Sequence, residues 1–360
     1  MRFPEFSGEW ETKSINDLAD VIGGGTPDTT VKSYWDGGIQ WFTPSEIGKN
    51  KFVDASLRTI TEDGLNNSSA KLLPPNTILL SSRATIGECS LSLRECATNQ
   101  GFQSLVSKKC NVDFLYYLIQ TKKKDLIRKS CGSTFLEISA NEVRKIQVSV
   151  PSDVEQQKIA GLLSLIDKRI ATQNKIIDKL QSLIKGIAQN IVSNNKPNIR
   201  LSDCLDCSSS TLQESDVCET GIYPVYGANG IVGYLDNYNT EKEAVYIIKD
   251  GSGVGTVSYA TGKCSATGTL NTLQAKDGYS LQYLYYILKV FNFEPYKTGM
   301  AIPHIYFKDY GKAKIFCPSY TEQLRYARLQ SAIDSKLSVE KNILTSLSSQ
   351  KQYLLRQMFI

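Results

Sequence analysis

Residues 152–170 read SDVEQQKIAGLLSLIDKRI, and residues 319–337 read SYTEQLRYARLQSAIDSKL. The second stretch repeats the first at an offset of 167 positions. Over residues 151–193 and 318–360 the two align without a gap, with 12 identities in 43 positions. Both copies open with Pro-Ser-x-x-Glu, in which the serine and the glutamate can form the capping box that begins a helix. The chain therefore carries the same helix-forming segment twice.

Apolar residues recur along both copies at the spacing of a coiled-coil seam. The seam residues predicted to pack are Ile159, Leu163, Ile166, Ile170, Ile177, Leu180, Ile184 and Ile187 in the first copy, and Tyr326, Leu329, Ile333, Leu337, Leu344, Leu347, Leu354 and Met358 in the second. Gln173 and Glu340 are polar at equivalent seam positions. They either fix the register of the pairing or lie at the edge of the seam. At about 1.5 Å per residue, a helix of about 40 residues is a rod of about 60 Å.

The segments before the two helices are also related. Residues 131–152 align with residues 298–319 at the same offset, and residues 87–101 resemble residues 255–269. Within each segment, strand-like runs (76–81, 104–106 and 244–248) alternate with amphipathic helical runs (113–129 and 281–291). Two matched helices in one chain most simply pack antiparallel on each other, although a parallel dimer of two chains is an alternative. The predicted fold is α+β: two α/β domains separated by two long antiparallel coiled-coil-like helices, with an internal pseudo-twofold repeat. The expected boundaries are 1–150, 151–196 (helix), 197–317 and 318–360 (helix).

Composition gives weaker indications. A net charge of +5 is only mildly basic, so a nucleic-acid partner would have to be bound by local patches. No apolar run is long enough to span a membrane, and the N-terminus does not read as a signal peptide, so we expect a soluble, cytoplasmic protein. The nine cysteines include Cys204-x-x-Cys207 with Cys218 nearby, but the only histidine is His304. The interpretation is reduced thiols and no metal site.

Catalytic signatures are weak. The glycine-rich stretch 251–255 (GSGVG) lacks the Lys-Ser/Thr that completes a phosphate-binding P-loop. A single histidine leaves little basis for a Ser-His-Asp triad. We find no S-adenosylmethionine, methyltransferase or ATPase motif, and we expect a chain without catalytic residues.

Loop residues suited to DNA are the better candidates. Arg83 lies in SSRATIG (81–87) after a predicted strand, and Asn99 and Gln100 lie in the stretch TNQG (98–101). Arginine suits phosphate and guanine, and Asn and Gln suit adenine edges, although turn chemistry and a structural arginine would explain the same residues. The full set of predicted DNA contacts is Arg83, Ser82, Thr85, Asn99, Gln100, Lys49, Lys51, Ser133, Thr134, Tyr226, Asn229, Lys249, Ser252, Lys263, Thr267 and His304.

Several motifs together resemble a known family. The stretches GGGTPDTTVKSYWDGGIQWFTPSEI (23–47), SSRATIGECSLSL (81–93), ATNQGFQSL (97–105), YPVYGANGIVGYLDNYN (223–239) and IKDGSGVGTV (248–257), with the two helix openings, are similar to those of type I restriction-modification specificity subunits. The resemblance implies that each α/β domain is a target recognition domain reading one half of a bipartite double-stranded DNA sequence. The helices would set the spacer and dock two methyltransferase subunits, and restriction/translocase subunits would complete the assembly. S-adenosylmethionine, ATP and Mg²⁺ would bind in those partners. One departure is that DGSGVG stands in the second domain where SSRATIG stands in the first.

Two other functions fit the residues alone. One is a DNA methyltransferase-like enzyme with its own recognition domain, and the other is a coiled-coil scaffold that does not bind DNA. Binding of S-adenosylmethionine by the isolated chain would favour the enzyme, and the absence of any adenine mark in the host would favour the scaffold.

Overall fold

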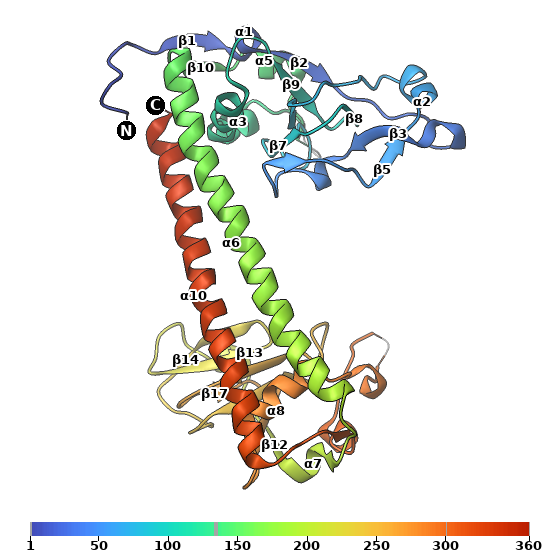
Figure 1. Ribbon diagram of the computed structural model, residues 1–360, viewed down its shortest axis with the longest axis vertical. Coiled ribbons are helices and arrows are strands. Elements are labelled where there is room, and N and C mark those ends of the chain that lie inside the picture. The colour runs from blue at the N-terminus through green and yellow to red at the C-terminus, as the bar shows by residue number, and fades with distance from the viewer. Residues whose placement is uncertain (1, 133–135, 300, 360) are drawn as a thin grey trace. The chain divides into compact units, whose positions relative to one another are not determined.

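The computed structural model describes residues 2–132, 136–299 and 301–359. The chain divides into two compact units: unit 1 comprises residues 1–173 and 343–360, and unit 2 comprises residues 174–342. Each unit contains an α/β domain and part of each of two long helices, α6 (Asp153–Ser193) and α10 (Tyr320–Met358), which are green and red in Figure 1. The helix boundaries agree with those predicted from the repeat to within a few residues.

Unit 1 is built on three small sheets. A five-stranded sheet has the order β2-β9-β6-β7-β4, a three-stranded sheet has the order β5-β3-β8, and β1 pairs with β10. The strands are β1 (Glu11–Ser14), β2 (Ala19–Gly23), β3 (Trp35–Phe42), β4 (Phe52–Val53), β5 (Arg58–Ile60), β6 (Ile78–Leu80), β7 (Cys89–Ser92), β8 (Cys96–Thr98), β9 (Gln103–Ser107) and β10 (Gln147–Val150). The short helices are α1 (Ile15–Leu18), α2 (Glu62–Asn66), α3 (Val112–Thr121), α4 (Lys123–Arg128) and α5 (Ala140–Arg144), with 3-10 turns η1 (Lys32–Tyr34) and η2 (Pro44–Glu46).

Unit 2 has the same strand orders except that, among the described residues, its larger sheet has no counterpart of β4. Its sheets have the orders β12-β18-β15-β16 and β14-β13-β17, and β11 pairs with β19. The central strand of each three-stranded sheet has one antiparallel and one parallel neighbour in both units. The elements are β11 (Ile199–Arg200), β12 (Leu205–Ser209), β13 (Tyr223–Gly227), β14 (Gly230–Leu235), β15 (Ala244–Ile248), β16 (Val257–Ala260), β17 (Ser265–Ala266), β18 (Leu270–Ala275), β19 (Lys314–Ile315), α7 (Leu201–Cys204), η3 (Glu214–Asp216), α8 (Leu281–Leu288), η4 (Glu294–Tyr296) and α9 (Phe307–Tyr310). The fold class predicted from the repeat is therefore confirmed.

The two long helices run antiparallel, as each unit shows separately. In unit 1 the first part of α6 shares a hydrophobic core with the end of α10, where Ile159 and Leu163 join Leu354 and Met358. In unit 2 the end of α6 joins the beginning of α10, and the Gln330 side chain donates to the carbonyl oxygen of Ile184 at 3.2 Å. The pairing is thus made within one chain, which distinguishes it from the parallel dimer.

The predicted seam residues are buried or half-buried, with one exception. Buried ones are Ile159, Leu163, Ile166, Ile177, Ile184, Leu337, Leu347, Leu354 and Met358, and half-buried ones are Ile170, Leu180, Ile187, Tyr326, Ile333 and Leu344. Leu329 was expected in the seam but is 51 % exposed, whereas its neighbour Gln330 is fully buried. Gln173 and Glu340 are also buried, so neither lies on the solvent-facing side of its helix.

The repeated Gln of the helix openings joins each long helix to its domain. The Gln156 side chain accepts from the backbone N–H of Asn111 at 3.0 Å and donates to the carbonyl of Pro151 at 3.0 Å. The Gln323 side chain does the same with the N–H of Ser280 at 2.9 Å and the carbonyl of Pro318 at 2.9 Å. Asn111 and Ser280 are the N-caps of α3 and α8. One glutamine therefore positions the beginnings of two helices in each unit.

The preceding glutamates behave differently from each other. The Glu322 carboxylate accepts from the backbone N–H and hydroxyl of Ser319, as expected of a capping glutamate. The Glu155 carboxylate is buried and accepts two hydrogen bonds of 2.7 Å from the Arg2 guanidinium. The capping box predicted for the first helix is therefore replaced by an arginine from the N-terminal segment.

Other predicted elements differ in their bounds. The helix expected over residues 113–129 is two helices, α3 and α4, which share Lys122 as a cap. The helix expected over residues 281–291 ends at Leu288.

Candidate nucleic-acid interface

A loop of unit 1 presents Arg83 at the end of a buried strand. Residues 81–88 connect β6 with β7, and the turn has positive φ at Ala84 (52°) and Gly87 (86°). A non-glycine residue in this left-handed region is uncommon and costs conformational energy, which surrounding contacts must offset. The backbone of Ser82 supplies such contacts by donating to the Gly101 carbonyl and accepting from the Ile138 N–H. Arg83 thus projects from a loop that is held on both sides.

A second segment of unit 1 faces this loop. Cys131 and Glu137 exchange two backbone hydrogen bonds of 2.9 Å, so the chain doubles back next to Arg83. The Arg83 guanidinium lies 2.8 Å from the Glu137 carboxylate, and the two side chains are 43 % and 38 % exposed. An ion pair this exposed contributes only about 0–1 kcal/mol.

Unit 2 contains the same arrangement 167 residues later. Lys249 replaces Ser82, and its backbone donates to the Thr269 carbonyl and accepts from the Ile305 N–H. Thr298 and His304 exchange two backbone hydrogen bonds, as Cys131 and Glu137 do. Gly251 has positive φ at the position equivalent to Ala84. The two loop pairs therefore share a backbone framework, namely the bonds that anchor the loop to the second segment, although the loop of unit 2 is one residue longer, since the Ile248 N–H donates to Thr256 whereas the Ser81 N–H donates to Glu88.

The side chains on this framework have opposite polarity in the two units. His304 Nδ1 lies 2.7 Å from Asp250 Oδ1, and these side chains are 36 % and 38 % exposed. Asp250 stands at the position of Arg83, and His304 at the position of Glu137. In unit 1 the basic group comes from the first loop, and in unit 2 it comes from the second segment.

Asn99 and Gln100 lie at the end of β8 but have local partners. The Asn99 side chain accepts from the N–H of Gly101 at 2.9 Å, and the Gln100 side chain accepts from the Thr26 hydroxyl at 2.5 Å. Gln100 remains exposed and Asn99 half-exposed.

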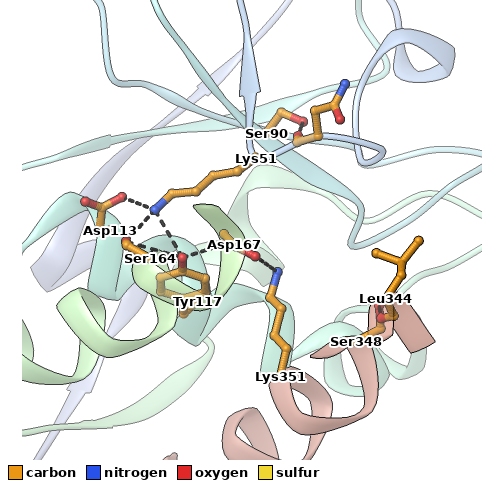
Figure 2. Close-up of polar contacts among 10 residues, drawn as sticks. Lys51, Ser90, Asp113, Tyr117, Ser164, Asp167, Leu344, Ser348 and Lys351 are labelled. Carbon is orange, nitrogen blue, oxygen red and sulfur yellow. Dashed lines mark hydrogen bonds and ion pairs between the residues drawn. The ribbon is translucent and has the colours of Figure 1, made fainter. Parts of the chain in front are cut away.

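Lys51 is placed inside unit 1 and not at its surface (Figure 2). Its ammonium is 2.6 Å from the Asp113 carboxylate and donates to the Ser164 hydroxyl at 2.8 Å and the Tyr117 hydroxyl at 3.1 Å. The side chain is 8 % exposed. Releasing a cation with three partners from a buried position is costly, so the prediction that Lys51 contacts DNA is not supported by its position.

The network around Lys51 continues to both long helices. The Tyr117 hydroxyl donates to Asp167 of α6 at 2.6 Å, and Lys351 of α10 is 2.7 Å from the same carboxylate (Figure 2). Burial raises the pKa of Tyr117, so its phenol keeps the proton that it donates. In unit 2, Tyr286 donates to Asp334 of α10 at 2.7 Å. Both domains thus hold their long helix through a tyrosine and the aspartate of the repeat.

The remaining predicted contacts fall into three groups. Ser82 and Thr267 are buried, so their side chains do not lie at the surface. The side chains of Thr85, Lys49, Asn229, Ser252 and Lys263 are exposed, and those of Tyr226 and Lys249 are half-exposed. Lys263 lies 4.6 Å from the centre of the Tyr238 ring, and a hydrogen bond with that phenol raises the pKa of the lysine. Ser133 and Thr134 lie outside the described residues.

Glu137 and Asp250 are not among the DNA contacts predicted from the sequence. The signal was present, because the offset of 167 aligns Arg83 with Asp250 and Glu137 with His304. The aligned positions carry opposite charges, which is compatible with two ion pairs in which the acidic and basic positions are exchanged. Only the fold shows that the two residues of each pair, 54 positions apart in the chain, are in contact.

Within the described residues, no group of three or more His, Cys, Asp or Glu side chains is arranged to hold a metal ion. Cys204 of the Cys-x-x-Cys motif is buried, and burial raises the pKa of its thiol to about 12. No helix in the described part of the chain is long and apolar enough to cross a membrane.

Comparison with known proteins identifies relatives. A type I restriction enzyme specificity subunit of Methanocaldococcus jannaschii, MjaIX, is 39 % identical over 180 residues, which is 48 % of this chain and 42 % of that protein. The Escherichia coli EcoprrI specificity subunit is 25 % identical over 356 residues, covering 91 % of this chain and 88 % of that protein. The matched region is thus less than half of the first relative and most of the second.

Solved structures share the fold. The crystal structure of a type I restriction-modification S subunit from M. genitalium superposes with a TM-score of 0.66 at 19 % identity, covering 100 % of this chain and 99 % of that one. The family model of the type I restriction modification DNA specificity domain matches residues 7–182 and again residues 197–349. Matched twice over most of its length, the chain belongs to the family of type I restriction-modification specificity proteins.

Proposed function

We propose that this chain is the DNA-recognition subunit of a type I restriction-modification complex, in which each α/β domain reads one half of a bipartite target. The proposal is supported by family membership and by relatives that are named specificity subunits. It assigns sequence reading to this chain and chemistry to its partners.

The observation that carries this proposal is the repeated loop framework with different side chains. In both units the residue before the charged loop residue accepts from an isoleucine N–H of the second segment, and two reciprocal backbone hydrogen bonds join Cys131 to Glu137 and Thr298 to His304. Base readout depends on the donors and acceptors that a loop presents. Because Arg83 and Glu137 are replaced by Asp250 and His304, the two frameworks present different donors. We therefore expect the two halves of the target to differ in sequence.

The long helices are proposed to set the distance between the half-sites. Half-site spacing in DNA-binding proteins follows from the distance between reading elements. Each unit holds its domain to the helices through Gln156 or Gln323 and through Tyr117 or Tyr286. With these joints fixed, helix length becomes the variable that determines the spacer.

The same helices are proposed to dock two methyltransferase subunits. Both carry large apolar side chains that the chain leaves exposed, namely Leu165 and Leu183 on α6 and Leu329 and Val339 on α10. A partner subunit that covered these side chains would remove apolar surface from water, which is favourable. We expect S-adenosylmethionine, ATP and Mg²⁺ to bind to the methyltransferase and restriction/translocase subunits, and the complex to act in the cytoplasm on host DNA.

Methylome sequencing tests the proposal. A host expressing this chain with its methyltransferase should show one adenine-methylated bipartite motif, and a host lacking only this chain should lose it. Retention of the mark without this chain, or no bipartite mark with it, would contradict the proposal. Binding of S-adenosylmethionine to the purified chain alone would favour an enzyme instead.

A further inference from the structure

The two acidic residues that the sequence reading overlooked occupy matched places in the two units. Glu137 binds Arg83, and Asp250 binds His304, and the two residues of each pair also form an isolated antiparallel bridge at positions that align at the offset of 167. In each pair the acidic and basic side chains are similarly half-exposed. A pair that served only to close the loop could keep the same polarity in both units, whereas here the acidic and basic positions are exchanged.

Both pairs can open at little cost. The Arg83 guanidinium has one carboxylate partner and faces solvent over much of its surface. The Lys51 ammonium differs, because it is almost fully buried between Asp113, Ser164 and Tyr117. Surface pairs gain little free energy because water competes for both partners. A phosphate or base acceptor can therefore replace Glu137 at Arg83, but not the partners of Lys51.

We propose that Glu137 and Asp250 are specificity-determining residues, each of which holds the basic side chain of its unit until a DNA acceptor replaces the carboxylate. This inference rests on the proposed function. In unit 1 the released donor is the planar, bidentate guanidinium of Arg83, which matches the O6 and N7 atoms of guanine. In unit 2 the released group is the imidazole of His304, which lies on the opposite segment and meets Asp250 through Nδ1. The two halves of the target are thus read by different donors from opposite sides of one framework.

The two carboxylates raise specificity for the target because they oppose binding of DNA that lacks the target sequence. A phosphate approaching Arg83 also approaches Glu137, whose negative charge repels it. Only an acceptor that satisfies the guanidinium more fully than Glu137 does gains net free energy. Specificity is a difference of affinities, and a repulsive group that penalises the wrong partner increases that difference. Removing the carboxylate should therefore raise the affinity for all DNA and reduce the difference in affinity between the target and other sequences.

The test compares Glu137→Gln and Arg83→Gln in the intact complex with the methyltransferase. The probes are a duplex carrying the motif found by methylome sequencing and a duplex of the same composition with that motif scrambled. Arg83→Gln should weaken binding to the target about fivefold or more. Glu137→Gln should tighten binding to the scrambled duplex about threefold, because one repelling charge is removed at moderate distance. The two variants should thus change DNA binding in opposite directions.

Matched variants distinguish a role of Glu137 in specificity from a purely structural role. Glu142→Gln neutralises a similarly exposed carboxylate on α5, which pairs with Lys145, and should leave the ratio of target to scrambled binding unchanged. Asp250→Asn should relax selection only in the other half of the target. If Glu137→Gln weakens target binding as Arg83→Gln does, or leaves both duplexes unchanged, Glu137 is no specificity determinant and the inference is overturned. Failure of the proposed function is a separate result, since the unmodified complex would then show no preference for any motif.

Discussion

The role of a single residue in this protein depends on its contacts with residues that are distant in the sequence, as Lys49 and Lys51 show. Lys49 and Lys51 lie two positions apart in a basic stretch, and their chemistry is the same. Lys51 is nevertheless buried, and its ammonium contacts Asp113 and Ser164, which lie 62 and 113 residues further along the chain. Lys49 is exposed, and the described residues include no hydrogen bond or ion pair for it. Sequence reasoning grouped both as DNA contacts because no local pattern separates them.

A pair of substitutions tests this difference. Lys51→Met should lower the free energy of unfolding by about 1–3 kcal/mol, because it leaves the buried Tyr117 hydroxyl and the half-exposed Asp113 carboxylate without their cation. Lys49→Met should leave stability within about 0.5 kcal/mol. Urea denaturation measures both. In DNA binding the order reverses: Lys49→Met should reduce the slope of log K against log salt by about 1, and Lys51→Met should not.

Equal stabilities for the two variants would contradict the placement of Lys51. A reduced salt slope for Lys51→Met in the folded protein would return that residue to the DNA contacts.

At the scale of elements, the repeated Glu-Gln pair shows which features of a helix a sequence pattern predicts and which it does not. The pattern predicted where both long helices begin, and the structure agrees. It did not show that Gln156 and Gln323 also bind the N-caps of α3 and α8, because those partners lie 45 and 43 residues upstream. It also suggested two capping boxes, but Glu155 is bound by Arg2, and the first ten residues show no periodicity that indicates this.

Truncation of Gln156 or Gln323 should therefore lower the free energy of unfolding. Gln156→Ala leaves the N–H of Asn111 and the carbonyl of Pro151 without their partner. We expect a loss of about 2–3 kcal/mol in the free energy of unfolding, measured by urea denaturation. Gln157→Ala is the matched control, since Gln157 is the next residue on the same helix and is exposed. It should cost less than about 0.5 kcal/mol. Similar losses for both variants would mean that Gln156 does not join the two helices.

At the scale of the whole molecule, the internal repeat was the most informative feature. It predicted two α/β domains and two long helices, and the sheet orders of the two units agree except for β4, which has no counterpart in the described part of unit 2. The seam residues predicted from apolar spacing are buried or half-buried wherever apolar residues alone form the seam. It was misread at Leu329, because the buried position is taken by Gln330, whose side chain pairs with a backbone carbonyl of α6. Apolar periodicity cannot identify a polar residue that is buried by such a bond.

Helix length offers a prediction at the same scale. Inserting seven residues into both α6 and α10 keeps the phase of the seam and lengthens each helix by about 10 Å. If the helices set the spacer, the methylated motif should keep both half-site sequences while its spacer grows by about three base pairs, at about 3.4 Å each. Methylome sequencing of a host carrying the lengthened chain measures this. An unchanged spacer in a complex that still methylates DNA would remove the helices from this role.

The central claim is that each α/β domain reads one half of the target independently. It is tested most directly by replacing residues 197–317 with the corresponding domain of a relative and sequencing the methylome of a host that expresses the hybrid with the methyltransferase. The account predicts a bipartite motif in which one half changes and the other half, read by unit 1, is retained. A motif altered in both halves, or unaltered in both, would contradict it.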